Sequence, residues 1–369
     1  MLILIAGDFF IKPSVLKGYV EKELSKIKEL EPLQFRLLDW KFFREGEVSY
    51  TGAIQPIGVR EAAGSPEDLM KEVRGSKPGV LIVHGAPVTK EVMEAAEGLR
   101  VIGCTRGGPV NVDVKAATER GIPVLFTPGR NADAVADFTM GLILAQLRNI
   151  ARAHDDLKNG FWNLAYNRYE SLGFELKNRV LGIIGLGHIG SKVAERAKGF
   201  GMRVIAYDPY VSEKKALRMG VRLVSLKSLL RRSDIVSLHC RLTKETIRLI
   251  DEKAISLMKP TAILVNTSRG GVVDTEALYK ALSEGRIAGA ALDVYETEPL
   301  GKDSPLLRLQ NVTLTSHIAG YSKDVVHRCG RMIASDLRRF FTGKKPRYIY
   351  NPEVLGEKGQ KERIGGYKL

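Results

Sequence analysis

The chain has 369 residues, 44% of them hydrophobic, which exceeds the needs of one ordinary core and predicts two domains. Its formal net charge is +15, but Lys and Arg mostly alternate with Glu and Asp, as in "EKELSKIKELE". This pattern indicates solvated helix faces and argues against a nucleic-acid surface. No apolar run is long enough to span a bilayer, and the three cysteines lack the spacing of a disulfide framework or a metal site.

The first third of the chain alternates short β-type runs with amphipathic segments. The runs are "LILIAGD", "QFRLLDW", "GVLIVHG", "RVIGCT" and "PVLFTP", and helical patterns such as "TKEVMEAAEGL" lie between them. This alternation is typical of a parallel sheet with helices on its faces. The N-terminal "MLILIAGDFF" begins as a strand, without the basic leader of a secretory signal, so we expect a cytoplasmic protein.

A long helical pattern follows Thr127-Pro128-Gly129 and runs from Asn131 to a stop at Gly160. Apolar residues recur at helical spacing throughout it, which predicts a helix that connects two lobes. Its "MGLIL" face is more apolar than one lobe needs.

A second αβ series begins at "NRVLGIIGLGHIG", where an apolar strand leads into a glycine-rich turn and then a helix. In this turn Gly185 permits a tight bend, Gly187 lets the backbone approach a pyrophosphate, and Gly190 allows close packing of helix and strand. The N-terminus of the helix, at His188 and Ile189, offers N–H groups and positive potential to phosphates. The turn therefore predicts a dinucleotide site.

A carboxylate stands where such a site requires one. Asp208 follows the next strand, eighteen residues after Gly190, and can accept hydrogen bonds from a ribose 2′-hydroxyl while repelling a 2′-phosphate. Pro209 occupies the place where an arginine would favour NADP. We therefore expect NAD as the cofactor, and we expect His239 and Thr267, at later strand ends, to contact it as well.

Three further segments place chemically active residues where strands of this series end. "LVNTSRGGVVD" carries Arg269, "AALDVYETEP" carries Asp293 and Glu298, and "LTSHIAG" carries His317. Because open α/β sheets bind ligands at the carboxyl ends of their strands, we expect these side chains to gather at one edge.

With these motifs in this order, the sequence resembles the D-isomer-specific 2-hydroxyacid dehydrogenases, from about Val80 to Phe341. The family includes phosphoglycerate dehydrogenases, glyoxylate/hydroxypyruvate reductases and D-lactate dehydrogenases. The resemblance implies that Arg269, Glu298 and His317 match the catalytic arginine, glutamate and histidine. It also implies that Asp293 matches the aspartate that contacts the nicotinamide carboxamide.

The residue types suit this chemistry. A histidine can accept the hydroxyl proton in oxidation and donate a proton in reduction, and a neighbouring carboxylate such as Glu298 would orient its ring. Arg269 can bind a substrate carboxylate in a fork and polarise the adjacent carbonyl. The expected reaction interconverts a small D-2-hydroxy acid and its 2-oxo acid with NAD, and no metal is required.

The first domain departs from the family at the expected substrate loop "CTRGGPVNVD". Arg106 stands where many members have a small residue, and Gly107 and Gly108 follow it. We expect the N–H groups of the two glycines to hold the substrate carboxylate, and Arg106 to read a further acidic or hydroxylated part. Arg106 in a surface or interdomain ion pair remains an alternative. Arg241 stands at a position of the expected adenine pocket where relatives usually carry proline. Its guanidinium either stacks on the adenine or faces water.

These observations predict an α/β protein with two Rossmann-like domains that contain parallel sheets. We expect a discontinuous substrate-binding domain of residues 1–128 completed by 320–351, an NAD-binding domain of residues 129–319, and a flexible tail of residues 352–369. The alternative function is an NAD(H)-sensing interaction protein, like the corepressors that share this fold. We expect no membrane partner for either function. The resemblance implies a homodimer in which the helix from Asn131, with its "MGLIL" face, pairs two NAD domains.

Overall fold

Two parallel sheets organise the chain, because its apolar runs are short, β-branched and separated by helical segments. The computed structural model describes residues 1–40, 50–51, 59, 62 and 64–356. Within these residues the chain divides into two units, and it passes between them at Arg130/Asn131 and Gly320/Tyr321. Apart from Tyr50–Thr51, unit 1 contains the described N-terminal part up to Arg130 and the chain from Tyr321 onward. Unit 2 contains Tyr50–Thr51 and the chain from Asn131 to Gly320.

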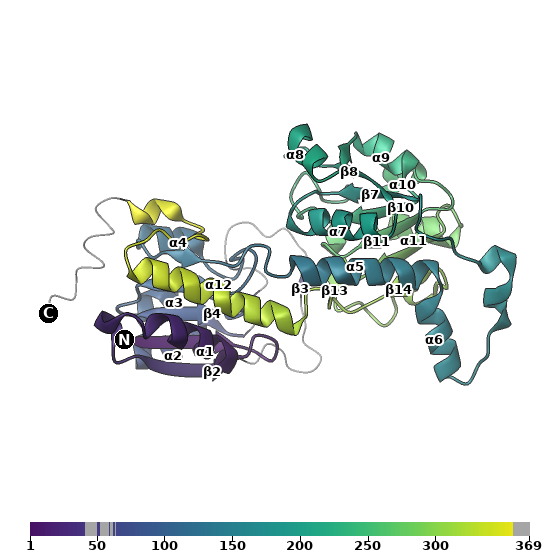
Figure 1. Ribbon diagram of the computed structural model, residues 1–369. Helices are drawn as coiled ribbons and strands as arrows, with labels where there is room; N and C mark the ends of the chain where they lie inside the picture. Colours follow the sequence, from purple (N-terminus) through teal and green to yellow (C-terminus); the bar gives the residue numbers. More distant parts are fainter. Residues whose placement is uncertain (41–49, 52–58, 60–61, 63, 357–369) are drawn as a thin grey trace. The chain divides into compact units, whose positions relative to one another are not determined.

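Unit 1 is built on a five-stranded parallel sheet in the order β2-β1-β4-β5-β6. Helices α1 and α12 lie side by side on one face (Figure 1), and α2, α3 and α4 cover the other. The elements are β1 (Leu2–Gly7), α1 (Pro13–Leu24), η1 (Lys28–Leu30), β2 (Gln34–Asp39), α2 (Pro66–Ser76), β4 (Val80–Val83), α3 (Lys90–Ala95), β5 (Val101–Cys104), α4 (Val114–Glu119), β6 (Val124–Leu125), α12 (Lys323–Phe341) and η6 (Pro352–Leu355).

Unit 2 is built on a seven-stranded parallel sheet in the order β14-β12-β11-β10-β7-β8-β9. Its elements up to the sheet's centre are β3 (Tyr50–Thr51), α5 (Ala132–Leu147), α6 (Ile150–Lys158), η2 (Leu164–Asn167), η3 (Tyr169–Ser171), β7 (Val180–Ile184), α7 (His188–Gly199), β8 (Arg203–Tyr207), α8 (Glu213–Arg218) and β9 (Arg222–Leu223). The remainder are α9 (Leu226–Arg232), β10 (Ile235–Leu238), α10 (Glu252–Ser256), β11 (Ile263–Asn266), η4 (Gly270–Val272), α11 (Thr275–Ser283), β12 (Gly289–Leu292), β13 (Thr297–Glu298), η5 (Pro305–Arg308) and β14 (Val312–Leu314).

Two hydrophobic cores enclose the sheet of unit 2. Helices α5 and α7 pack together on one face (Figure 1), and α9, α10 and α11 pack on the other. Strands β10, β11 and β12 are buried along their whole length and are mostly aliphatic, as expected for a parallel sheet that is covered on both faces.

The register of unit 2 brings five strand ends into one row. Ile184, Leu238, Asn266, Leu292 and Leu314 are successive partners across β7, β10, β11, β12 and β14. The segment that follows each of these residues therefore starts at the same carboxyl edge of the sheet. This places the glycine turn, and the segments that carry Arg269, Asp293 and His317, at one edge.

The two Rossmann-like sheets confirm the predicted fold class, and the structure adds three details. The segment predicted as one long helix is two helices, α5 and α6, because Asn149 between them adopts a left-handed φ of 56°. Tyr50–Thr51 pairs with β13 and belongs to unit 2, although it falls within residues 1–128. The tail predicted to be flexible begins with the 3₁₀ turn η6, and its residues 357–369 lie outside the described part.

Candidate active site

The glycine turn after β7 is shaped by close backbone approaches. Gly185 has a φ of 93°, and a Cβ atom on it would lie 2.7 Å from the backbone nitrogen of Cys240. A Cβ atom on Gly190 would lie 2.1 Å from the carbonyl oxygen of Gly185. Neither position has room for a side chain, so both glycines are required by the turn itself.

Gly187 differs from these two glycines because its surroundings are open. A Cβ atom there would meet no heavy atom within 4 Å. Gly187 precedes α7, whose N-terminus receives no side-chain capping bond, and His188 and Ile189 form its first turn. Bare backbone N–H groups beside open space form a cradle that suits a pyrophosphate.

Asp208 connects the end of β8 to this turn. Its Oδ2 atom accepts a hydrogen bond from the Leu186 N–H at 2.8 Å, and its Oδ1 atom accepts one from the Tyr210 N–H at 2.9 Å. A carboxylate has about four acceptor sites, so Asp208 retains capacity for a hydroxyl group. The geometry is compatible with the predicted contact to a ribose.

His239, after β10, has a buried polar atom without a partner. Its backbone N–H donates to the Ile184 carbonyl at 2.8 Å, and its Nε2 atom lies 2.8 Å from the Ser237 hydroxyl oxygen. The Nδ1 atom is buried and has no hydrogen-bond partner among the described residues. Burial lowers the pKa of His239 to about 3, so the ring is neutral. An orphaned Nδ1 atom next to the glycine turn fits a site completed by a bound group.

Thr267, after β11, contacts Thr139, a residue to which no sequence motif pointed. Its hydroxyl lies 2.9 Å from the hydroxyl of Thr139 on α5, which itself donates to the Val135 carbonyl at 2.7 Å. Thr139 therefore accepts a hydrogen bond from the Thr267 hydroxyl. The available sequence signal was a threonine on the apolar face of a helix, which by itself points only to a buried position.

His317 and Glu298 are in close contact at this edge of the sheet. The His317 Nδ1 atom lies 2.6 Å from the Glu298 Oε2 atom, and the His317 side chain is 32% exposed whereas that of Glu298 is 8% exposed. The other carboxylate oxygen of Glu298 accepts the Tyr295 N–H at 2.9 Å. The glutamate is thus fixed from two sides, and its contact with Nδ1 orients the His317 ring.

Asp293 holds the turn that carries His317. Its Oδ1 atom accepts the Thr315 hydroxyl at 2.7 Å and the Ile318 N–H at 2.9 Å, and its Oδ2 atom accepts the Ala319 N–H at 2.9 Å. Its carbonyl accepts the His317 N–H at 2.8 Å. These bonds surround the left-handed backbone of His317, whose φ is 56°. About one acceptor site of the carboxylate remains for the predicted carboxamide contact.

Arg269 occupies the turn after β11. Its Nη1 atom donates to the Ser268 carbonyl at 2.8 Å, and its own carbonyl accepts a hydrogen bond from the Asn266 side chain at 3.0 Å. A Cβ atom on the next residue, Gly270, would lie 1.8 Å from the Tyr295 carbonyl carbon. The Arg269 turn therefore packs directly on the backbone that leads to Glu298.

Tyr295 touches the segments of all three predicted catalytic residues. Its backbone contacts the Arg269 turn at Gly270, its N–H donates to Glu298, and its hydroxyl donates to the Thr315 carbonyl at 2.8 Å, two residues before His317. Burial raises the pKa of the Tyr295 hydroxyl, so it remains a donor. This tyrosine stands within the motif "AALDVYETEP", but nothing in the sequence assigned it a role.

The predicted substrate residues lie in unit 1, after β5. The Arg106 carbonyl accepts the Thr127 N–H at 2.9 Å and the Thr127 hydroxyl at 3.1 Å, which joins the loop to the end of β6. A Cβ atom on Gly108 would meet nothing within 4 Å, and one on Gly107 would only touch the Thr127 carbonyl oxygen. The loop is therefore open around both glycines.

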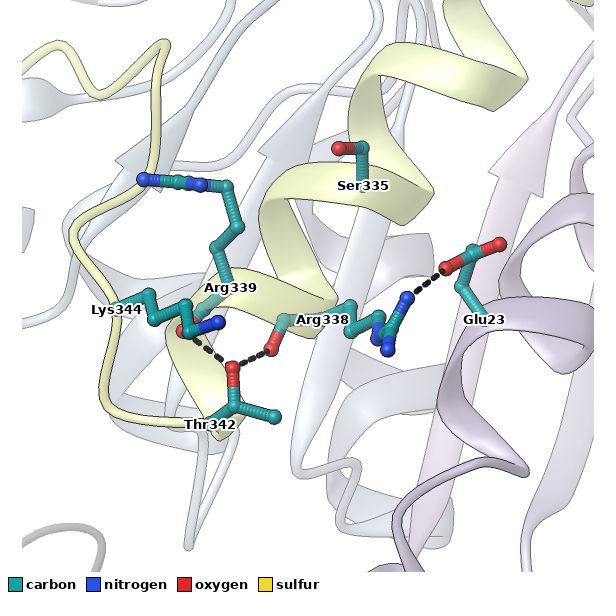
Figure 2. A pocket seen from close by; sticks show the side chains of 6 residues that line it. All are labelled: Glu23, Ser335, Arg338, Arg339, Thr342 and Lys344. Carbon is teal, nitrogen blue, oxygen red and sulfur yellow. Dashed lines mark hydrogen bonds and ion pairs between the residues drawn. The ribbon is translucent and has the colours of Figure 1, made fainter.

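The hollow shown in Figure 2 contains none of the predicted site residues. It has a volume of about 250 Å³ and is lined in unit 1 by Glu23, Ser335, Arg338, Arg339, Thr342 and Lys344. Among the residues that the structure describes, no group of three or more His, Cys, Asp or Glu side chains is arranged to hold a metal ion. No helix in the described part of the chain is long and apolar enough to cross a membrane.

Comparison with known proteins identifies relatives over most of the chain. Residues 140–319 match the family described as D-isomer specific 2-hydroxyacid dehydrogenase, NAD binding domain. A glyoxylate reductase of Korarchaeum cryptofilum is 47% identical over 94% of this chain and 98% of its own length. A D-3-phosphoglycerate dehydrogenase of Methanocaldococcus jannaschii is 42% identical over 83% of this chain, which spans 58% of that longer protein.

Solved structures extend the likeness to the fold. The TT0316 protein from Thermus thermophilus superposes with a TM-score of 0.74 and 33% identity, over 95% of this chain and 100% of that one. The glycine cradle, Asp208 and the orphaned His239 nitrogen suit the NAD that the matched domain binds. The chain belongs to the D-isomer specific 2-hydroxyacid dehydrogenase family of NAD-binding oxidoreductases.

Proposed function

We propose that the protein interconverts a small D-2-hydroxy acid and its 2-oxo acid, with His317 and Glu298 as the acid–base pair. The observation that carries this proposal is the 2.6 Å contact between His317 Nδ1 and Glu298 Oε2 at the carboxyl edge of the NAD-binding sheet. Because Nδ1 faces the carboxylate, the Nε2 atom is the one that exchanges a proton with substrate. Nε2 accepts the hydroxyl proton in oxidation and returns it to the carbonyl oxygen in reduction.

Glu298 has two proposed roles in this mechanism. It accepts the Nδ1–H of His317, which fixes the tautomer and the angle of the ring, and it balances the charge of the imidazolium formed during alcohol oxidation. The bond from the Tyr295 N–H keeps the carboxylate from rotating away. Bound NAD supplies the hydride chemistry.

Arg269 is proposed to bind the substrate carboxylate and to polarise the adjacent carbonyl, since a guanidinium stays charged and can donate two parallel hydrogen bonds. In unit 1 we assign the N–H groups of Gly107 and Gly108 to the same carboxylate, and Arg106 to a more distant substrate group. The open surroundings of both glycines support their part. On this basis unit 1 is the substrate-binding domain.

Eight residues are proposed to hold the cofactor, with Asp293 as a ninth that also anchors the catalytic turn. The glycine turn and the start of α7 would bind the phosphates, Asp208 a ribose, and His239 and Thr267 the remaining polar groups. These residues are Gly185, Gly187, His188, Ile189, Gly190, Asp208, His239, Thr267 and Asp293.

Steady-state kinetics with a series of 2-oxo acids test the proposed function. Purified protein with NADH is offered glyoxylate, hydroxypyruvate and longer 2-oxo acids, and NADH oxidation is followed by absorbance. Glyoxylate is the first probe because the relative of K. cryptofilum is named a glyoxylate reductase. Turnover that is lost in His317→Gln supports the proposal. Tight NADH binding without turnover of any 2-oxo acid would instead favour the NAD(H)-sensing alternative.

We also propose a homodimer through unit 2, on different residues from those that the sequence indicated. Met140, Leu142 and Ile143 of α5 are buried within unit 2 itself, so they are not available to a partner. The segment after α5 instead exposes an unusual number of large apolar side chains, and such a patch indicates a protein contact. These are Ile150, Leu157, Phe161, Trp162, Leu164, Tyr169 and Leu172.

The oligomeric state tests this contact. Light scattering after size exclusion should give twice the mass of the chain, and Trp162→Ser with Phe161→Ser should shift the mass toward that of a monomer. A monomeric wild-type protein would contradict the proposed dimer.

A further inference from the structure

A basic hollow in unit 1 is lined by none of the residues of the proposed function. It has a volume of about 250 Å³, many times that of one water molecule (Figure 2). Glu23, near the end of α1, forms one part of its lining, and the last turns of α12 with the segment up to Lys344 form the rest. We call this feature the α12 hollow.

The lining of the α12 hollow has more cations than carboxylates. Three positive charges come from Arg338, Arg339 and Lys344, and Glu23 is the one acidic residue of the lining. That carboxylate is shared, because its oxygens lie 2.7 Å from the Lys26 Nζ atom and 3.2 Å from the Arg338 Nη1 atom. Hydrogen bonds from these two cations lower the pKa of Glu23, so it is ionised, yet the hollow keeps a surplus of positive charge.

A neighbouring carboxylate on α12 does not remove this surplus. Asp336 is buried, does not line the hollow, and accepts the N–H groups of Arg347 and Tyr348 at 2.8 and 2.9 Å. Other exposed cations of unit 1 have a nearby carboxylate, as Arg36 has in Glu72 at 2.7 Å. The α12 hollow therefore differs from an ordinary charged surface on which the two signs balance.

The end of α12 does not require these cations. Basic side chains near the end of a helix commonly bond to its last carbonyl groups. Here the Thr342 hydroxyl donates to the Arg338 and Arg339 carbonyls, at 2.9 and 3.2 Å. The Lys344 N–H also donates to the Arg339 carbonyl, at 2.8 Å. The side chains of Arg339 and Lys344 are thus not occupied in capping the helix.

Several donors of the hollow have no partner in the part of the chain that the structure describes. The Arg339 guanidinium donates from Nε to the Lys345 carbonyl at 2.8 Å, which leaves its two terminal nitrogens without a bond there. The Lys344 ammonium and the Ser335 hydroxyl likewise make no bond with a described residue. A serine inside a helix can bond to the carbonyl four residues earlier, but Ser335 does not, so its hydroxyl is free to donate to a ligand.

These donors match the chemistry of a phosphoryl group. Such a group carries about one and a half to two negative charges at pH 7 and three strong acceptor oxygens. A guanidinium can bind two of these oxygens in a fork, an ammonium acts as a point charge, and a hydroxyl can donate to the remaining oxygen. A carboxylate has one charge and two oxygens in one plane, so it would satisfy fewer of the donors.

We propose that the α12 hollow binds a small phosphorylated molecule, with Arg339, Lys344 and Ser335 as donors. Arg338, held by Glu23, adds to the positive potential. The ligand is free phosphate, a diphosphate or a phosphate ester, because these share the group that the donors recognise. This site goes beyond the proposed function and takes no part in the proposed reaction.

Equilibrium binding tests the site without turnover. Inorganic phosphate, pyrophosphate and glycerol 3-phosphate are titrated separately into the full-length protein by calorimetry, with excess NADH present so that the anions do not enter the proposed cofactor cradle. At least one of them should bind about 10-fold more tightly than succinate. The tighter of phosphate and glycerol 3-phosphate distinguishes a free ion from an ester. Absence of binding by all three, or equal binding of succinate, would overturn the inference.

Charge variants locate the binding. Arg339→Gln should weaken binding of the preferred probe about 10-fold, and Lys344→Gln about 3-fold, because an exposed ammonium contributes less. Lys345→Gln is the matched control, since it removes the same charge from the next residue, which does not line the hollow, and should leave the affinity unchanged. Equal weakening by Lys344→Gln and Lys345→Gln would indicate a diffuse positive surface and refute the site.

An uncharged variant tests the geometry. Ser335→Ala removes one donor without altering the net charge, and alanine suits a helix interior, so α12 should remain folded. Its affinity for the preferred probe should fall about 3- to 10-fold, as the loss of a hydrogen bond to an anion predicts. An unchanged affinity would contradict the proposed set of donors.

Discussion

Each sheet of this protein carries a histidine bonded through Nδ1 to a carboxylate at its carboxyl edge, and the two pairs differ in their surroundings. His84 lies 2.5 Å from Asp8, and His317 lies 2.6 Å from Glu298. The side chain of His84 is 8% exposed, whereas that of His317 is 32% exposed. The two distances from Nδ1 to the carboxylate oxygen are nearly equal. The burial of each ring and the group at its other nitrogen must therefore decide what that ring does.

His84 is enclosed and its second nitrogen is occupied by Arg130. A ring in that situation is a neutral link between a carboxylate and a guanidinium, and it carries no proton to a substrate. His317 lies in a left-handed turn held by Asp293, and its side chain is about one third exposed. The same pair of residue types thus supports positioning in unit 1 and, in our proposal, proton transfer in unit 2.

The largest expected effect is a loss of catalytic activity when the pair in unit 2, His317 and Glu298, is changed. His317→Gln should lower kcat/KM about 1000-fold, because a positioned acid–base group contributes on that order. Glu298→Gln, which keeps the shape of the side chain but removes its charge, should cost less, about 10- to 100-fold. Steady-state kinetics with NADH and the best 2-oxo acid measure both.

The matched control is His327→Gln, on the exposed surface of α12, which should retain wild-type rates. Wild-type activity in His317→Gln would contradict the acid–base assignment.

The second prediction separates the histidines by stability. Unfolded His84 binds a proton near its ordinary pKa of about 6.5, whereas folded His84 resists protonation until pH falls to about 4. Acidification through this window therefore favours the unfolded state, and His84 alone should cost up to about 3 kcal/mol of unfolding free energy. Urea unfolding at several pH values between 7 and 4 measures the slope.

His84→Gln should flatten this slope without removing it, because His239, whose pKa is about 3, acts in the same direction. Identical slopes in the variant and the wild type would show that His84 is not the buried neutral group described above.

The third prediction concerns the cofactor side of the unit 2 edge. Gly187→Ala should leave the fold intact, because its Cβ atom would enter open space, and should weaken NAD binding about 10-fold by filling the phosphate cradle. Fluorescence titration with NADH measures the dissociation constant. Gly190→Ala is the comparison, since its Cβ atom would collide with the Gly185 carbonyl and should reduce the yield of folded protein. Unchanged NADH affinity in Gly187→Ala would argue against the cradle.

The smallest expected effect tests how the exposed pair is held. Tyr295→Phe removes the hydroxyl that donates to the Thr315 carbonyl, a bond worth about 1 kcal/mol, and should lower kcat about 3- to 10-fold with little change in KM. Tyr19→Phe, which removes an exposed hydroxyl bonded to His327, is the control. A selective rise in KM would point to substrate binding as the affected step.

The local motifs made much of unit 2 predictable. The glycine turn stands between a strand and a helix, and Arg269, Asp293 and His317 each follow an apolar run, so their placement at one sheet edge needed only the rule for parallel strands. The predicted residues Glu298 and His317 do lie in contact. Their catalytic roles remain predictions that the experiments above address.

The break at Asn149 shows where periodicity was insufficient. Apolar spacing continues from α5 into α6, and one left-handed residue between them redirects the chain and leaves the apolar side chains of the second helix exposed. Which apolar face is buried depends on the helix packed against it, here α7, and not on the face itself. The apolar face that the sequence indicated for a dimer contact is therefore part of the core of unit 2.

The sequence by itself determined the alternation of strands and helices, the glycine turn and the kinds of side chain at the strand ends, because these depend on local spacing and residue chemistry. Only the tertiary structure decided that His84 bonds to Asp8, 76 residues away, that Arg130 has neutral partners, and that Tyr295 reaches three separate segments. Sheet register and burial arise from residues far apart in the chain, and they set which protons, charges and acceptors remain available for function.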